Sequence, residues 1–130
     1  MNRKTMKPTE AELEILQILW RSGPVTVRFV NDELNKKRRI GYTTTLKMMQ
    51  IMLEKGMLSR NEENRSHLYS PLLNENDTQN FLLNRLVKSA FGGSALKLVV
   101  SALGNGKTSK TELDEIKKFI DAIENEKGEE

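Results

Sequence analysis

Four consecutive hydroxyl-bearing residues, Tyr42-Thr43-Thr44-Thr45, follow a glycine and are themselves followed by Lys47. β-Branched threonines are poor residues for a helix interior, but this cost falls at a helix N-terminus. Free backbone amides and the helix dipole at that end favour an anion, and threonine can bond base edges or contact a thymine methyl. The cluster therefore predicts a helix end that reads DNA bases, through Tyr42, Thr43, Thr44, Thr45 and Lys47. One capping threonine followed by two solvent-facing ones is the purely structural alternative.

Basic side chains are concentrated in the same half of the chain. Residues 1–73 carry 13 Lys and Arg against 8 Asp and Glu, whereas residues 74–130 carry 8 against 10. This asymmetry is typical of a polyanion-binding unit joined to another function, although ordinary proteins also show it. Contacts to phosphates set register and salt sensitivity rather than sequence preference. We expect four residues to contact the backbone of double-stranded DNA: Lys36, Arg39, Arg60 and Arg65.

A helix near the N-terminus is the first element expected to support this surface. Thr9 and Glu12 have the spacing of a capping box, and the apolar residues that follow recur at helical spacing. Gly23, followed by a proline, ends the pattern. Trp20 lies on the apolar stripe, so we expect it in the core rather than stacked on a base.

Two further helices follow after short connections. Apolar residues at helical spacing predict a second helix over 27–34, and residues 25–27 fit either a strand or the entry to this helix. The third helix is expected to begin at Tyr42 and to end at a left-handed Gly56. Its predicted core face consists of Leu46, Met49, Met52 and Leu53.

A hairpin is expected directly after the third helix, with strands over 57–60 and 66–70 and a turn near Asn64. Three closely connected helices followed by a hairpin are the pattern of a winged helix-turn-helix domain. The predicted fold is therefore mainly α with a small β wing. We assign residues 1–73 to a DNA-binding domain and residues 74–130 to a helical dimerisation domain.

The dimerisation assignment rests on three helical patterns with too many apolar residues for a monomer to cover. Pairing with a second copy would bury them, and folding back onto the N-terminal domain is the alternative. The residues expected at the dimer interface are Phe81, Leu96, Val99, Val100, Leu103, Leu113, Ile116, Ile120 and Ile123.

Composition and motifs exclude several classes of function. The chain has no cysteine and a single histidine, His67, which leaves little for a metal site or a catalytic triad. Nucleotide-binding loops and hydrolase motifs are absent, and 37% hydrophobic content does not fill a large enzyme core. No apolar run reaches membrane-spanning length, and the first residues lack a signal peptide. We expect a cytoplasmic protein without enzymatic activity, cofactor, metal or membrane insertion.

The order of several motifs resembles the penicillinase repressor family (BlaI and MecI). The resemblance begins with residues 9–15 and Trp20, and continues through Tyr42-Thr43-Thr44, residues 55–58 and Tyr69-Ser70-Pro71. It covers residues 7–73 closely and the remainder by helix pattern. It implies a homodimeric repressor of transcription that binds a palindromic operator and controls antibiotic-response (β-lactam) genes or related ones. It also implies a membrane sensor-protease as a partner that cleaves the repressor.

This sequence departs from the family pattern in three ways. The Asn-Phe cleavage pair of the antibiotic-responsive members is absent near Ser101-Ala102, which puts proteolytic induction in doubt. The cysteine cluster of the copper-responsive relatives is also absent, which excludes copper sensing. Lys47 and Ile51 replace threonine and arginine, which leaves the operator sequence open.

Two other functions fit the same elements. A winged helix can serve as a protein–protein interaction module, in which case the basic residues are solubilising charge. A repressor that responds to a small molecule is the third alternative, although no feature of the sequence marks a pocket.

Overall fold

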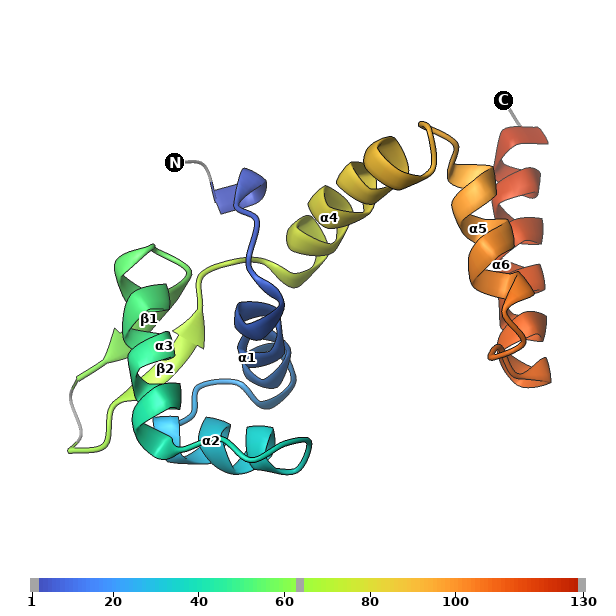
Figure 1. Ribbon diagram of the computed structural model, residues 1–130. Coiled ribbons are helices and arrows are strands. Elements are labelled where there is room, and N and C mark those ends of the chain that lie inside the picture. Colours follow the sequence, from blue (N-terminus) through green and yellow to red (C-terminus); the bar gives the residue numbers. More distant parts are fainter. Residues whose placement is uncertain (1–2, 63–64, 129–130) are drawn as a thin grey trace. The chain divides into compact units, whose positions relative to one another are not determined.

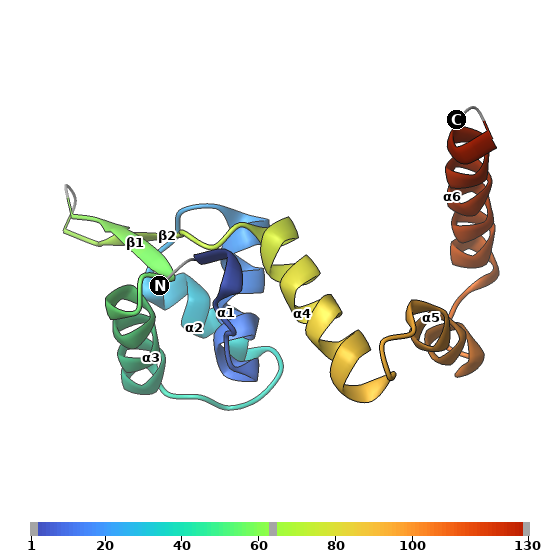
Figure 2. The same cartoon turned by 90° about the horizontal axis from the view of Figure 1, so that it is seen from above.

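The computed structural model describes residues 3–62 and 65–128, which form two compact units that divide between Arg85 and Leu86. The described residues contain six α-helices, one 3-10 helix (η1, Arg3–Thr5) and one two-stranded antiparallel sheet. This mainly helical fold with a small sheet confirms the predicted fold class. In the first unit, three helices lie together and the hairpin begins beside α3 (Figures 1 and 2).

Helix α1 (Glu10–Ser22) begins and ends as predicted. Thr9 Oγ1 accepts a hydrogen bond from the Glu12 amide, and the Glu12 carboxylate accepts one from the Thr9 amide, which completes the capping box. Gly23 follows the helix with a φ of 77°, a conformation that favours glycine.

Helix α2 (Val27–Asn35) follows a segment that combines the two predicted alternatives. Thr26 caps the helix by accepting a hydrogen bond from the Phe29 amide. Val25, one residue earlier, forms an antiparallel bridge with Tyr69, with backbone hydrogen bonds of 3.2 and 2.8 Å. Residue 25 therefore extends the sheet by one bridge, and the helix starts two residues later.

Helix α3 (Tyr42–Glu54) has the expected bounds, but its buried face differs from the predicted one. The fully buried residues are Thr45, Met49 and Met52, whereas Leu46 and Leu53 are only partly buried. The prediction assumed that a threonine would lie outside the core. The helix is instead rotated so that a hydroxyl faces α2, where it finds a hydrogen-bond partner.

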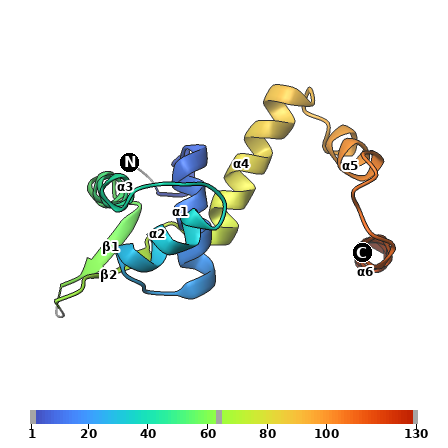
Figure 3. The same ribbon diagram turned by 60° about the horizontal axis from the view of Figure 1, so that its bottom comes forward.

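Strands β1 (Leu58–Asn61) and β2 (Leu68–Pro71) confirm the predicted wing, with Leu58 opposite Pro71 and Asn61 opposite Leu68. The hairpin extends beyond the three helices (Figure 3). The turn predicted at Asn64 lies outside the described residues. Tyr69 points into the core and is fully buried.

The apolar core of the first unit is built from residues between Met6 and Leu73. Its central members come from α1, α2, α3 and the hairpin, namely Ile15, Leu16, Leu19, Val30, Leu34, Met49, Met52, Leu58 and Tyr69. Trp20 packs against this core as predicted, and its indole nitrogen donates a 2.9 Å hydrogen bond to the Leu73 carbonyl.

Helix α4 (Glu75–Ala90) begins where the sequence suggested a linker. The Asn74 side chain accepts a hydrogen bond from the Asp77 amide, so the polar run after Leu73 becomes the first turn of the helix. The compact units divide further along, inside α4. The predicted domain boundary at residue 73 stays a prediction.

The second unit contains α5 (Ala95–Gly104), which Ser94 caps, and α6 (Lys110–Gly128). None of its described residues is buried. No single helix in the described chain is long and apolar enough to cross a membrane. Only α4 and α5 counted together, across the break at Gly92-Gly93, reach that length and composition.

Candidate nucleic-acid interface

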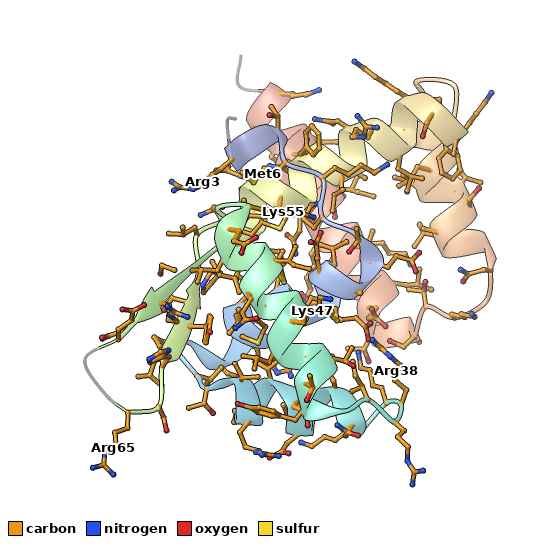
Figure 4. The ribbon with its side chains drawn as sticks, turned by 60° about the vertical axis from the view of Figure 1, so that its left-hand side comes forward. Arg3, Met6, Arg38, Lys47, Lys55 and Arg65 are labelled. Carbon is orange, nitrogen blue, oxygen red and sulfur yellow. The ribbon has the colours of Figure 1, made fainter. Side chains whose placement is uncertain are left out.

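The first turn of α3 presents most of the predicted base-contacting residues. Tyr42, Thr43, Thr44 and Lys47 are exposed, and Figure 4 marks the position of Lys47 on α3. Gly41 precedes the helix and has no side chain that could cap it, so the first amides are open to solvent or to a ligand. An uncapped helix start is suited to acceptors such as base edges or phosphate oxygens.

Thr45 differs from the prediction. Its side chain is fully buried, and its hydroxyl accepts a 2.8 Å hydrogen bond from Asn31 Nδ2. A base edge cannot reach this hydroxyl while α2 covers it. The prediction of base contact is therefore wrong for Thr45, because three consecutive threonines cannot all lie on one side of a helix.

Two asparagines of α2 fix the connection that leads into α3. Asn31 and Asn35 both donate from Nδ2 to the Ile40 carbonyl, at 3.1 and 2.9 Å. The Asn35 side chain also accepts a hydrogen bond from the Ile40 amide. These bonds hold the residue just before Gly41, and so they position the start of α3 relative to α2. Sequence reasoning missed this role, since a single asparagine on a helix carries no clear signal.

Arg28 is a second residue that sequence reasoning did not assign to the interface. Its guanidinium carbon lies 4.5 Å from the centre of the Tyr42 ring, which joins the start of α2 to the start of α3. Tyr42 is 38% exposed, so the stacked pair lies at the surface beside Thr43 and Thr44. The sequence signal that could have assigned Arg28 to the interface is its position as the second residue of a helix with a capping threonine.

The four predicted phosphate-contacting residues have different surroundings. Arg65 is exposed and points outward from the hairpin (Figure 4), and Arg39 is exposed in the connection before α3. Lys36 is exposed but forms an ion pair with Glu33. Arg60 forms an ion pair with Glu62, and its interactions with Tyr69 and then with Glu62 raise the pKa of its guanidinium. Arg60 and Lys36 would exchange an internal partner for a phosphate, whereas Arg65 would not.

Within the described ranges, no group of three or more histidine, aspartate and glutamate side chains could hold a metal ion. His67 is exposed just before β2. The site offers hydrogen-bond donors and positive charge, which suit the binding of an anion.

The second unit and the adjoining part of α4 expose the residues predicted for a dimer interface. Leu96 is 71% exposed and Val100 is 59% exposed, and Ile120 of α6 is 46% exposed. The remaining predicted residues are exposed or half-buried, including Phe81, which stacks with Arg85 in the first unit. Apolar surface of this extent is typical of a region that pairs with another surface.

Fold and surface together define a winged helix-turn-helix DNA-binding protein. Comparisons with known proteins make the class more specific. The sequence profile of the penicillinase repressor family matches residues 8–122, so the chain belongs to this family. It is a DNA-binding transcriptional repressor and not an enzyme.

The individual relatives agree with this assignment. The penicillinase repressor of Bacillus licheniformis is 24% identical over 98% of this chain and 99% of its own length. The methicillin resistance regulatory protein MecI of Staphylococcus aureus is 20% identical over 92% of this chain and 98% of its own. The solution structure of the DNA-binding domain of the repressor BlaI covers 56% of this chain and 89% of its own, with 27% identity and a TM-score of 0.50.

Proposed function

We propose that this protein is a homodimeric repressor that binds a palindromic operator through two winged helices. Each copy would place the start of α3 in the major groove, where Tyr42, Thr43, Thr44 and Lys47 read bases. Arg65 and Arg39, together with Lys36 and Arg60, would contact the backbone. The observation that carries the proposal is the uncapped, hydroxyl-rich start of α3, which lies at the surface beside Arg28.

The dimer is supported by the apolar residues of α5 and α6, none of which is buried within the described chain. Two helix ends that enter successive major grooves must lie about 34 Å apart, and two-fold symmetry then requires a palindromic operator. The names of the relatives favour antibiotic-response genes as the targets. A repressor of such genes would act in the cytoplasm, where the DNA lies.

A salt titration tests DNA binding directly. The full chain and a labelled 30-base-pair duplex of mixed sequence are measured by fluorescence anisotropy between about 50 and 200 mM salt. Several phosphate contacts predict a steep linear fall of log K with log salt. A winged helix that serves protein–protein contacts would show neither measurable affinity at low salt nor this slope, and that result would overturn the proposal.

Induction by a membrane sensor-protease would require cleavage near Ser101 and Ala102. Both residues are exposed but lie inside α5, so the backbone there is hydrogen-bonded in the helix. Incubation of the protein with membranes that contain such a protease, followed by N-terminal sequencing of the fragments, tests this step. A new N-terminus within α5 supports it, and an intact chain excludes it for that protease.

A further inference from the structure

A groove of about 270 Å³ lies between the start of α2, the start of α3 and the residues that lead into β2. Its lining includes three basic side chains, Arg28, Arg65 and His67, and four hydroxyl-bearing residues, Thr26, Tyr42, Ser66 and Tyr69. No carboxylate of the described residues lines it. The lining is therefore suited to an anion and opens beside the helix end that faces DNA in the proposed function.

Arg28 is one of several described arginines, with Arg39, Arg65 and Arg85, whose guanidinium pairs with no carboxylate. Arg21, Arg38 and Arg60 each pair with a carboxylate. The Arg28 side chain forms no hydrogen bond or ion pair within the described ranges, and its contact is the stack on Tyr42. Stacking on an aromatic ring leaves the in-plane N–H donors of a guanidinium free. The same contact limits the motion of the side chain, which lowers the entropy lost when an anion binds.

We propose that this groove holds one backbone phosphate of duplex DNA, clamped by Arg28 and Arg65 at the edge of the base-reading surface. Arg28 lies on α2, and Arg65 lies at the rim of the groove on the hairpin side with its guanidinium pointing outward (Figure 4), so a phosphate bound by both would fix the wing and the helix start on the same strand. The proposal rests on the proposed function, because it requires that α3 faces DNA. It assigns to Arg28 a role in affinity and positioning, with no part in reading sequence.

Arg28→Gln is the direct test, and Arg85→Gln is its matched control. Arg85 also stacks on an aromatic ring, with its guanidinium 5.6 Å from the centre of Phe81, but it lies on α4, outside the groove. Both variants lose one positive charge and one stacking contact. Affinity is measured for a mixed-sequence duplex and for a duplex that the wild-type chain selects from a random pool.

The expected result is a loss of about tenfold on both duplexes for Arg28→Gln, with a salt slope lower by about one. Arg85→Gln should behave as the wild type does. Arg28→Lys keeps the positive charge but loses the planar guanidinium with its paired N–H donors. It should therefore show the wild-type salt slope and only part of the wild-type affinity. A loss of affinity confined to the selected duplex would assign Arg28 to base reading. No loss on either duplex would show that Arg28 does not contact DNA. Either result would overturn the proposal.

Neutral methylphosphonate linkages identify the phosphate. The selected duplex is prepared with one such linkage at each position in turn, and wild type is compared with Arg28→Gln. One position should weaken the wild type by about tenfold and the variant, which keeps Arg65, by clearly less. If every position weakens both proteins equally, the clamp is wrong.

Inorganic phosphate distinguishes a DNA phosphate from a free anion. At equal ionic strength, phosphate should displace the duplex no better than chloride does. Selective displacement by phosphate that disappears in Arg28→Gln would make the groove a site for a free anion and would overturn the assignment to DNA. If the wild type binds neither duplex at low salt, it is the proposed function itself that fails.

Discussion

Asn31 Nδ2 donates a 2.8 Å hydrogen bond to Thr45 Oγ1, and both side chains are buried where α2 crosses α3. The same amide group donates to the Ile40 carbonyl, so the asparagine ties the body of α3 and the preceding connection to one point of α2. No buried side-chain nitrogen or oxygen in the described part of the chain lacks a hydrogen-bond partner. A satisfied buried pair of this kind fixes the relative position of two helices.

Thr45→Val should therefore lower stability without changing which DNA sequences are preferred. The valine keeps the shape but removes the acceptor, so one Asn31 hydrogen loses its buried partner. We expect the free energy of unfolding to fall by about 1–2 kcal/mol in urea denaturation. Thr44→Val, at the neighbouring exposed position, should stay within about 0.5 kcal/mol of the wild type. Equal effects of the two substitutions would show that burial of the Thr45 hydroxyl does not contribute to stability.

Thr44→Ala should have the opposite profile. The exposed Thr44 hydroxyl and methyl lie on the first turn of α3, where they can reach a base edge. We expect a loss of about 1–2 kcal/mol in binding to the duplex that the wild type selects from a random pool, and a smaller loss on random duplex. Thermal unfolding should be unchanged. Equal losses on both duplexes would remove Thr44 from the residues that read sequence.

The contrast between these two threonines also indicates how far the sequence alone could lead. Periodicity and capping signals were sufficient for α1, α2, α3 and the hairpin, because those signals act within a few residues of one another. They could not show which of three adjacent threonines faces inward, since that depends on Asn31, which is 14 positions away. The stack of Arg28 on Tyr42 is of the same kind, because two helices must be placed before the contact exists.

Arg65→Ala tests the contact of the hairpin with DNA. The side chain is exposed and points away from the protein, so its removal should leave stability unchanged (Figure 4). Affinity should fall on selected and random duplexes alike, and the salt slope should drop by about one. Arg21→Ala, which removes a charge paired with Glu33, serves as the control and should keep the slope. An unchanged slope for Arg65→Ala would exclude this residue as a phosphate contact.

Glu12 makes stability depend on pH. Burial by itself raises the pKa of this carboxyl, but the hydrogen bond from the Thr9 amide and the hydrogen bond and charge of Lys55 outweigh it and leave the pKa below its usual value. Because the folded pKa lies below the unfolded one, the stabilisation is complete above the ordinary glutamate pKa and is lost as pH falls through the folded pKa.

Glu12→Gln should therefore lower the free energy of unfolding by about 1 kcal/mol at pH 7, with a smaller difference from the wild type at pH 3. Urea denaturation at the two pH values measures this difference. The control is Glu10→Gln, at an exposed position in the same turn, which should cost only a few tenths of a kcal/mol through the helix dipole. A constant difference between wild type and Glu12→Gln from pH 7 to pH 3 would contradict the assigned ionic role.

Ile120→Glu tests whether the apolar residues of α6 pair with a second copy. Ile120 is 46% exposed, and a carboxylate there would be desolvated in an apolar interface at a cost of several kcal/mol. Sedimentation equilibrium should report the 14.9 kDa monomer for this variant and twice that mass for the wild type. Thr111→Glu adds the same charge at an exposed polar position of the same helix and should remain dimeric. Because a monomer contacts only half of a palindromic operator, the Ile120→Glu variant should also bind the selected duplex at least tenfold more weakly than the wild type does. If the wild type itself is a monomer and still binds this duplex tightly, the symmetric mode of binding is wrong.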